Sequence, residues 1–477
     1  MKRLMLLLCL LMLRSVAGEA PLRRGFNLLE MFIWSPAKTA PKFQEQDFQF
    51  IRENGFNFVR LPLDYRFWIA DGQWDRIDEA KLAPIDEAVA LGAKYGVHVQ
   101  LCFHRIPGYT VARPAEPRNL FTDDEALRVA VLHWRTFAKR YKDIPSDRVS
   151  FNLFNEPANA TEEQYEKVGK ALIEAIRAED PDRLIVADGL DWASKPVKSL
   201  FKYNIEQAAR GYWPMSVSHY KASWVGTPTE TPIWPPSRAM SPLFGPVKKP
   251  WDVPLTLTDL PPCRVTIHPG RTSGKVRLVA EADGKEVLNL VLEPGTDGLW
   301  TNVQYHAQWH IAQGTCLSSY AFELPGSVKR LTLRVTEGDW MGLDRIEFRI
   351  GEKVQTLGFT NSWGMPDGRP VQFMGSESAD AGLTAIRGRI ALWQPAFEAK
   401  VPVMVGEFGA FNYTPHDVVL RWMEDNLKVW KENRLGWALW NLRGSFGVLD
   451  SDRKDVVYED WHGRKLDRKM LELLKKY

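Results

Sequence analysis

The sequence predicts a (β/α)8 barrel that is interrupted once by a β-sandwich. Short apolar runs typical of buried strands alternate with amphipathic helical segments along most of the chain. The alternation continues through eight repeats, the number that closes a parallel sheet into a barrel. One long segment, residues 221–378, breaks the alternation because it shows strand and turn patterns without a clear helix.

The predicted barrel strands are short and apolar, and residues 401–405 are nearly continuous in apolar character, as expected for a strand buried on both faces. The eight strands are residues 25–30, 56–63, 98–104, 149–156, 183–189, 215–220, 401–409 and 436–442. Helices are predicted where apolar residues recur every three or four positions, in residues 42–55, 83–96, 125–143 and 162–180.

The interrupting segment begins with a Pro- and Trp-rich stretch, residues 227–246, which indicates irregular loop. Asp283-Gly284 then separates two alternating runs, a strong signal for a β-hairpin. We therefore expect a jelly-roll-like β-sandwich within 221–378, inserted after the sixth barrel strand and a candidate for carbohydrate binding. The barrel would occupy residues 21–220 and 379–477, roughly 300 residues, which is a common size for this fold.

The N-terminus has the layout of a secretory signal peptide. Lys2 and Arg3 precede an apolar run from Leu4 to Leu13, and small residues follow near position 20. This run is too short to cross a bilayer as a helix. We expect residues 1–20 to be removed and the mature chain to be secreted or periplasmic without a membrane span; a retained anchor is the alternative.

Composition and charge point to no special partner. The chain is 45% hydrophobic and 25% charged with a net charge of +3, which argues against nucleic acid and predicts a soluble monomer. The nine histidines lack metal-binding spacing and no glycine-rich phosphate loop is present, so we expect no metal and no cofactor. Cys263 and Cys316 could form a disulfide, which the sequence leaves open.

Two glutamates end predicted strands and stand out as catalytic candidates. Glu156 ends the fourth strand and Glu407 the seventh, and strand ends of a barrel face one another across its mouth. Two opposed carboxyl groups are what hydrolysis of a glycosidic bond requires. We expect Pro157 to hold Glu156 in an extended backbone conformation and burial to raise the pKa of Glu156. Arg60 could keep Glu407 ionised as a nucleophile.

Asn155-Glu156-Pro157 together with Glu407 resembles glycoside hydrolase family 5, the cellulase family of retaining β-glycosidases. The resemblance covers essentially the whole barrel and implies that Glu156 is the general acid/base and Glu407 the nucleophile. It also implies substrate-binding residues: Arg60 beside the nucleophile, His104 on strand three, Asn155 at the sugar 2-hydroxyl, and Trp440 as the floor of a sugar subsite.

The sixth strand departs from the family pattern. The family carries histidine, one residue and then a tyrosine that contacts the nucleophile, whereas here Tyr220 directly follows His219 and Lys221 takes the expected tyrosine position. Side chains alternate along a strand, so Tyr220 would point away unless a bulge intervenes. His219 and Tyr220 are nevertheless retained as candidate substrate-binding residues.

Structural alternatives exist for most of these residues. His104 and His219 could be buried structural histidines, Arg60 could pair with Asp64 or Glu30, and Trp440 could be core. Three tryptophans near the start of the insert suit either sugar stacking or anchoring of the inserted domain, and both interpretations remain open. They are Trp213, Trp224 and Trp234.

The function predicted from these residues is a secreted retaining β-glycoside hydrolase acting on a polysaccharide or its oligosaccharides, with a β-1,4-glucan as the default substrate. Alternatives on the same scaffold are a β-mannanase, a xyloglucanase, and an exo-β-1,3-glucanase or β-glucosidase. A non-catalytic carbohydrate-binding protein is the alternative of another class, and a barrel lyase or aldolase lacks the lysine expected at a strand end. We expect the insert to border the barrel mouth and shape the substrate sites.

Overall fold

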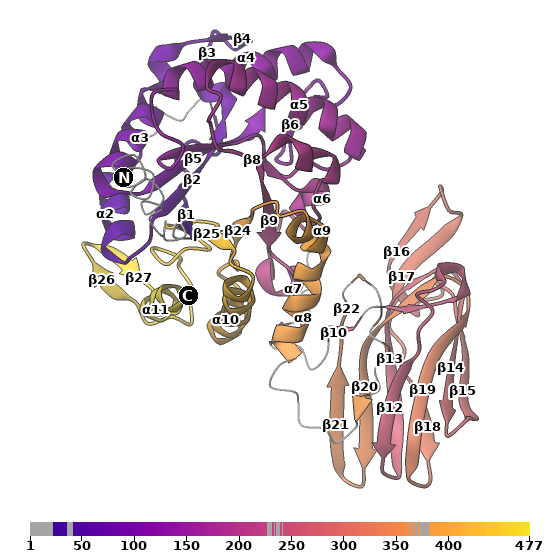
Figure 1. Cartoon of the computed structure of the whole chain (residues 1–477). Helices are drawn as coiled ribbons and strands as arrows, with labels where there is room; N and C mark the ends of the chain where they lie inside the picture. Colours follow the sequence, from indigo (N-terminus) through magenta and orange to yellow (C-terminus); the bar gives the residue numbers. More distant parts are fainter. Residues whose placement is uncertain are drawn as a thin grey trace, which may run out of the picture. The chain divides into compact units, whose positions relative to one another are not determined.

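The computed structural model describes residues 22–35, 42–226, 242–361 and 381–477, with the short stretches 231–232, 234, 239–240, 363–364, 366, 368 and 371–372. The chain forms two compact units (Figure 1). The first contains the described residues up to Tyr212, Ala391–Asn412 and Leu427–Tyr477. The second contains Trp213–Ile390 and Tyr413–Asn426. The predicted signal peptide lies outside the described residues.

Eight parallel strands of the first unit close into a barrel, as predicted. In barrel order they are β1 (Arg24–Asn27), β2 (Phe58–Asp64), β5 (His98–Ile106), β7 (Val149–Asn152), β8 (Ile185–Asp188), β9 (Glu206–Gly211), β24 (Val403–Phe408) and β25 (Gly436–Leu439). Closure comes from β1, which pairs with β2 through Gly25↔Phe58 and with β25 through Arg24↔Trp437. Because all strands run parallel, their carboxyl ends form one rim, where a barrel carries its functional groups.

The helices follow the predicted amphipathic segments and carry the expected end signals. Asp123 caps α4 (Asp124–Tyr141) by accepting hydrogen bonds from the Glu125 and Ala126 amides, and Thr161 forms a capping box with Gln164 on α5 (Glu162–Glu179). Gly96 ends α3 in the left-handed conformation. The α-helices are α2 (Glu45–Glu53), α3 (Ala83–Tyr95), α4 (Asp124–Tyr141), α5 (Glu162–Glu179), α6 (Leu190–Ala193), α7 (Met215–Ser218), α8 (Ala381–Ile390), α9 (Gln394–Glu398), α10 (His416–Glu432) and α11 (Arg468–Lys476).

The segments that connect the barrel strands and helices contain further short elements. The short strands are β3 (Ile69–Ala70), β4 (Gln73–Ile77), β6 (Tyr109–Thr110), β26 (Glu459–Trp461) and β27 (Arg464–Leu466). The 3₁₀ turns of this unit are η1 (Tyr65–Phe67), η2 (Glu79–Leu82), η3 (Lys198–Tyr203) and η5 (Ala391–Trp393).

The sixth barrel strand lies earlier in the chain than predicted. It is β9, Glu206–Gly211, whereas residues 215–218 of the predicted strand form the short helix α7. The central part of β9 is Gln-Ala-Ala, and its small side chains are buried without forming a conspicuous apolar run. The assignment of His219 and Tyr220 to the end of strand six is therefore wrong.

The insert contains two β-sheets that share one hydrophobic core. The first sheet has β11 (Leu243–Phe244), β20 (Trp340–Ile350), β13 (Cys263–Ser273), β17 (Ile311–Cys316) and β16 (Trp300–His306) in order, with β18 (Tyr320–Leu324) on β13 and β21 (Lys353–Gly358) on β20. The second has β15 (Lys285–Leu292), β14 (Val276–Ala282), β19 (Val328–Glu337), β12 (Leu255–Leu260) and β23 (Val371–Gln372). Strands β10 (Ala239–Met240) and β22 (Thr360–Asn361) pair separately, and η4 (Pro246–Lys248) is a 3₁₀ turn.

The core of this sandwich alternates along its strands, as the sequence predicts. Leu257 and Leu278 of one sheet share a buried cluster with Ile267 and Phe348 of the other. The predicted hairpin at Asp283-Gly284 is confirmed, because both residues have positive φ and they join β14 to β15.

Within the described residues, no helix is long and apolar enough to cross a membrane. The three described cysteines, Cys102, Cys263 and Cys316, are buried free thiols, so Cys263 and Cys316 do not form a disulfide in this structure. No group of three or more potential metal-ligating side chains occurs in the part of the chain that the structure describes.

We predict that Leu278→Ala lowers the free energy of unfolding of the sandwich by about 2–5 kcal/mol, because Leu278 is fully buried and its removal leaves a cavity. Val291→Ala on the neighbouring strand is the control, since Val291 is 42% exposed, and its effect should stay within about 0.5 kcal/mol. Denaturant unfolding of the full chain measures both. Equal effects of the two substitutions would contradict this packing.

Candidate active site

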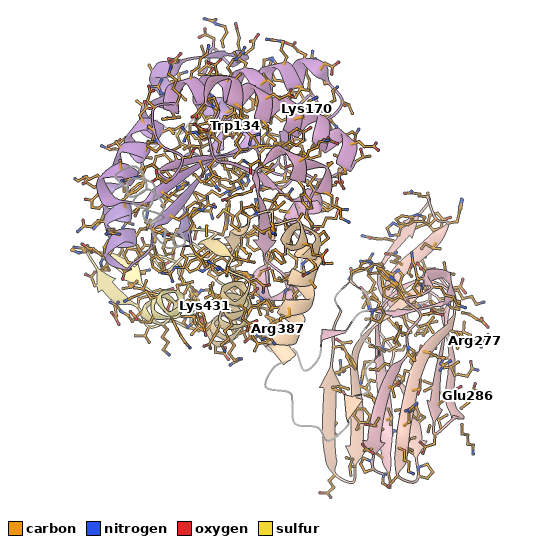
Figure 2. All side chains as sticks on the ribbon, in the orientation of Figure 1. Trp134, Lys170, Arg277, Glu286, Arg387 and Lys431 are labelled. Atoms are coloured by element: carbon orange, nitrogen blue, oxygen red, sulfur yellow. The ribbon has the colours of Figure 1, made fainter. Side chains whose placement is uncertain are left out.

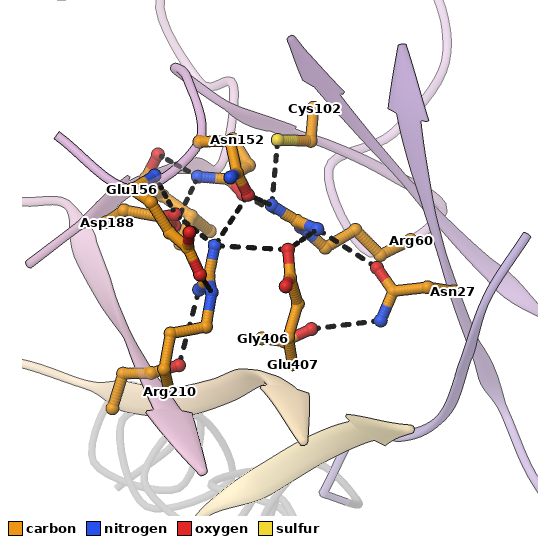
Figure 3. A network of polar contacts seen from close by, with 12 residues as sticks. Asn27, Arg60, Cys102, Asn152, Glu156, Asp188, Arg210, Gly406 and Glu407 are labelled. Carbon is orange, nitrogen blue, oxygen red and sulfur yellow. Dashed lines mark hydrogen bonds and ion pairs between the residues drawn. The ribbon is translucent and has the colours of Figure 1, made fainter. Parts of the chain in front are cut away.

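Glu156 and Glu407 are brought together at the carboxyl-end rim of the barrel (Figure 3). Glu407 is the fifth residue of β24, and Glu156 lies in the loop that follows β7. The Glu407 side chain is 3% exposed and the Glu156 side chain 15%. Both carboxyl groups are therefore largely removed from water. The sequence prediction placed both residues at this rim, and the structure places them beside the same arginine.

Arg60 is fully buried and uses its whole guanidinium within the site. Its Nη1 donates to Glu407 Oε1 at 2.6 Å, a charge-assisted contact. The other acceptors are Asn27 Oδ1 at 3.0 Å, Asn152 Oδ1 at 3.0 Å, Asn155 Oδ1 at 2.8 Å and Cys102 Sγ at 2.9 Å. The alternative partners do not apply, because Asp64 pairs with Arg66 and Arg105 and Glu30 pairs with Arg443.

A second buried arginine, Arg210 of β9, bridges the two glutamates. Its Nε donates to Glu156 Oε1 at 2.9 Å, and its Nη2 lies 3.2 Å from Glu407 Oε1. The same Nη2 pairs with Asp188 and donates to Asn155 Oδ1 at 2.7 Å. Sequence reasoning missed Arg210 and Asp188. The signal was a lone arginine after the small buried residues Ala208 and Ala209.

The tyrosine that contacts the nucleophile candidate is Tyr212. Its hydroxyl donates to Glu407 Oε2 at 3.1 Å, and it follows Arg210 by two positions. The expected His-x-Tyr pattern therefore occurs as Arg210-Gly211-Tyr212, with arginine in place of histidine. Glu407 thus receives contacts from two guanidinium groups and one hydroxyl.

His219 and Tyr220 belong to the second unit and make other contacts. The ring of His219 pairs with the Ser218 hydroxyl at 2.8 Å and lies edge-on to Trp224, and burial lowers the pKa of His219 to about 4. The Tyr220 hydroxyl lies 3.3 Å from the Thr231 hydroxyl. The contact with Glu407 that was considered for Tyr220 is made by Tyr212 instead.

Asn155 keeps a free donor beside the carboxylates. Its Oδ1 accepts hydrogen bonds from both Arg60 and Arg210, which fixes the orientation of the amide. Its Nδ2 is buried and has no hydrogen-bond partner among the described residues. A buried unsatisfied donor is costly, so this amide is suited to a ligand oxygen such as a sugar hydroxyl.

His104 and Trp440 meet in an aromatic cluster. The His104 ring lies 4.4 Å from that of Phe32 in an edge contact and 5.7 Å from that of Trp440. Burial and the nearby arginines lower the pKa of His104 well below its usual range, so the imidazole is neutral at pH 7. Trp440 is only partly buried, which leaves part of its surface available to a ligand.

The tryptophans near the start of the insert separate into two kinds. The Trp213 carbonyl accepts a hydrogen bond from Trp422, and the Trp234 indole donates to Asp425; both partners lie on α10. All four of these residues belong to the second unit, so the contacts lie within that unit. Trp224 is 57% exposed and keeps the sugar-stacking interpretation open.

The pKa of Glu156 is raised to about 7, mainly by burial. The negative charges of Glu407 and Asp188 raise it further, while the Arg210 charge opposes the shift. Glu156 therefore holds its proton to near neutral pH, as expected from the sequence.

The expected extended backbone at Glu156 is wrong. Its φ is +50°, in the left-handed region, which costs on the order of 1–3 kcal/mol for a residue with a side chain. Two hydrogen bonds hold this conformation: the Glu156 amide donates to Asp188 at 2.9 Å, and its carbonyl accepts from the Tyr109 hydroxyl at 2.7 Å.

Comparison with known proteins gives a consistent pattern. Residues 18–212 match the model of the family described as cellulase (glycosyl hydrolase family 5). Endoglucanase C of Acetivibrio thermocellus is 29% identical over 213 residues, which is 44% of this chain and 62% of that relative, so the chain matches less than two thirds of its length. Cellodextrinase A of Ruminococcus flavefaciens is 26% identical over 190 residues, 38% of this chain and 54% of that protein.

Solved structures cover nearly the whole chain. A crystal structure described as a glycoside hydrolase is 26% identical with a TM-score of 0.62, covering 95% of this chain and 99% of its own. The Cel5A protein of Thermotoga maritima, solved in complex with cellobiose, is 17% identical with a TM-score of 0.54, covering 95% and 96%. The second likeness bears on the fold alone.

We predict that Glu156 titrates near pH 7 and that Asp188→Asn lowers its pKa, because the substitution removes a neighbouring negative charge while keeping the size of the side chain. NMR titration of the glutamate carboxyl carbons measures both values. Glu163→Gln, at an exposed position of α5, is the control and should leave the Glu156 titration unchanged. An ordinary glutamate titration near pH 4.5 in the unsubstituted protein would contradict this electrostatic description.

Proposed function

We propose that this chain is a glycosyl hydrolase family 5 enzyme that hydrolyses β-glycosidic bonds with retention, using Glu156 as acid/base and Glu407 as nucleophile. The match of residues 18–212 to the model of that family supports the proposal. The observation that carries this proposal is the unequal environment of the two carboxyl groups beside one arginine. Burial raises the pKa of Glu156 to about 7, whereas Glu407 receives two guanidinium contacts and the Tyr212 hydroxyl.

In the first step, Glu407 attacks the anomeric carbon while the proton of Glu156 passes to the departing glycosidic oxygen. The bond from the anomeric carbon to that oxygen breaks and a glycosyl ester forms on Glu407. In the second step, Glu156 takes a proton from water, the water oxygen attacks the anomeric carbon, and the ester bond breaks. Both glutamates then return to their starting protonation states.

Arg210 suits this cycle because it contacts both glutamates. Before the first step the negative charge lies on Glu407; afterwards Glu407 is an uncharged ester and the charge lies on Glu156. The Arg210 guanidinium lies 2.9 Å from Glu156 and 3.2 Å from Glu407, so it stays paired with an anion throughout. Because the site is buried, this fixed positive charge acts through a low dielectric and needs little rearrangement.

Two further residues would position the sugar. The unpaired Nδ2 of Asn155 is a donor for the sugar 2-hydroxyl, and the Trp440 ring, held against Phe32, offers a flat surface for stacking. His104, neutral and packed on the same cluster, has a buried Nδ1 without a hydrogen-bond partner among the described residues, which suits a further sugar hydroxyl.

We propose a β-1,4-glucan as the substrate, since the relatives are named endoglucanases and a cellodextrinase. β-Mannan, xyloglucan and β-1,3-glucan are the alternatives that a product profile on a panel of glycans would separate. Secretion or export to the periplasm, based on residues 1–20, remains part of the proposal. The presence of both carboxyl groups in one site argues against a purely carbohydrate-binding protein.

We predict that Glu156→Gln and Glu407→Gln each lower kcat on an aryl β-cellobioside by about 10²-fold or more, because each removes a group that takes part in the reaction. Glu163→Gln, on the exposed face of α5, is the matched control and should retain full activity. Circular dichroism checks that the variants remain folded. Unchanged turnover in either active-site variant would exclude the assignment.

We predict that Arg210→Gln slows both chemical steps by about tenfold or more, because an anion loses its partner in each. Arg210→Lys keeps the charge and should retain more activity. Pre-steady-state measurement of aglycone release separates glycosylation from hydrolysis of the ester. If only one of the two rate constants falls, Arg210 does not serve both glutamates.

A further inference from the structure

The sandwich carries an exposed hairpin that its core does not explain. It consists of β16, the turn at residues 307–310 and β17, and we call residues 298–317 the aromatic hairpin. Figure 1 shows β16 and β17 projecting from one end of the sandwich, and Figure 2 draws the side chains on the same ribbon. β16 lies at the edge of its sheet and pairs with β17 alone.

Large apolar and aromatic side chains of this hairpin lie in solvent. Tyr305 is 65% exposed and Trp309 57%, whereas core residues of the same unit such as Leu278 are fully buried. Other exposed apolar side chains on the hairpin are Leu299 at 47%, Val303 at 38% and Leu317 at 64%. Contiguous exposed apolar surface commonly marks a contact site, and five such side chains on one hairpin make it a candidate.

The exposed rings are held by polar neighbours. The Tyr305 hydroxyl lies 3.4 Å from His310 Nδ1, and the Trp309 ring lies 5.6 Å from that of His306 at an angle of 37°. Each ring therefore has a polar or aromatic neighbour on the hairpin while most of its surface is exposed. Side chains ordered before binding lose less entropy when a ligand docks.

The hairpin is also free of charge. Residues 298–322 contain no Asp, Glu, Lys or Arg, although the chain as a whole is 25% charged. Its polar side chains are amides, hydroxyls and imidazoles. Arg271 of β13 reaches this surface, where its guanidinium donates to the Gln304 and Gln313 amides at 3.2 Å each.

We propose that the aromatic hairpin is a second carbohydrate-binding site that takes a neutral polysaccharide chain. Flat rings suit the apolar faces of pyranose sugars, and amide side chains such as Asn302 and Gln308 can pair with their hydroxyls. The absence of cationic side chains from residues 298–322 disfavours nucleic acid and anionic membrane surfaces, which need clustered positive charge. The guanidinium of Arg271, which reaches this surface, is already paired with Gln304 and Gln313, so a neutral polymer matches the uncharged side chains of the hairpin.

That the neutral polysaccharide is a β-glucan rests on the proposed function of the barrel. That the aromatic hairpin binds a polysaccharide does not rest on it. The test therefore uses the full chain with Glu407→Gln, so that no substrate is consumed. Retention on insoluble regenerated cellulose and migration in gels containing soluble β-glucan or β-mannan measure the affinity. Activity of the unsubstituted chain on an aryl β-cellobioside, measured in parallel, reports on the barrel separately.

Tyr305→Ala with Trp309→Ala should weaken polysaccharide binding by about tenfold or more, since stacked rings dominate such contacts. Tyr305→Phe with Trp309→Phe keeps both rings and should retain most of the affinity. Val354→Ala, at an exposed position of β21 in the same unit, is the control and should bind as the parent does. Turnover of the soluble aryl glycoside by otherwise unsubstituted chains should be unchanged in all three.

Equal retention of the alanine variant and its parent on every glycan would overturn the proposal. So would loss of affinity in the phenylalanine variant to the level of the alanine variant, because ring stacking would then not carry binding. A change of sedimentation coefficient caused by the alanine substitutions alone, without a change in glycan retention, would assign the hairpin to self-association instead. Failure of aryl glycoside turnover with intact glycan binding would reject the barrel's function and leave the hairpin site standing.

Discussion

The site depends on a balance of buried charge. Two arginines, Arg60 and Arg210, lie among three carboxyl groups at the barrel rim: Asp188, Glu156 and Glu407. Two positive charges cannot neutralise three negative ones, and an uncompensated charge in a buried site is expensive. One bound proton makes the cluster neutral. The raised pKa of Glu156 places that proton on Glu156, the most exposed of the three side chains. The chemistry proposed here moves the negative charge between the two glutamates without changing this balance.

Most of the barrel and the paired glutamates could be predicted because their signals are local. Apolar runs mark strands such as β2 and β24, and polar residues at their ends mark the rim. β9 gave no such signal, because its interior positions are filled by Gln207, Ala208 and Ala209 rather than by large aliphatic side chains. The stretch at 215–220 alternates apolar and polar residues, as a strand does, yet its first four residues form the short helix α7, which Pro214 directly precedes.

The residues that sequence reasoning missed are those whose role depends on contacts with residues far away in the sequence. Arg210 and Asp188 matter because the ends of β7, β8 and β9 bring them to Glu156, and no sequence motif indicates this contact. The backbone of Glu156 shows the same limit. A residue before proline favours an extended conformation, but hydrogen bonds from Tyr109 and to Asp188 outweigh that preference. Local rules fail where long-range contacts fix the geometry, and the active site is where such contacts concentrate.

The position of the insert has a consequence for how the chain folds. β9 and β24 are neighbours in the barrel, but roughly 190 residues separate them along the chain, where an ordinary crossover needs about 20. For a flexible connection, the longer loop would add about 2 kcal/mol of closure entropy to the pairing of these strands. A sandwich that folds first removes most of that penalty, because its own ordered core replaces the flexible chain. During synthesis, strands one to six emerge before the sandwich and strands seven and eight after it. The barrel sheet therefore cannot close until the inserted domain has been synthesised.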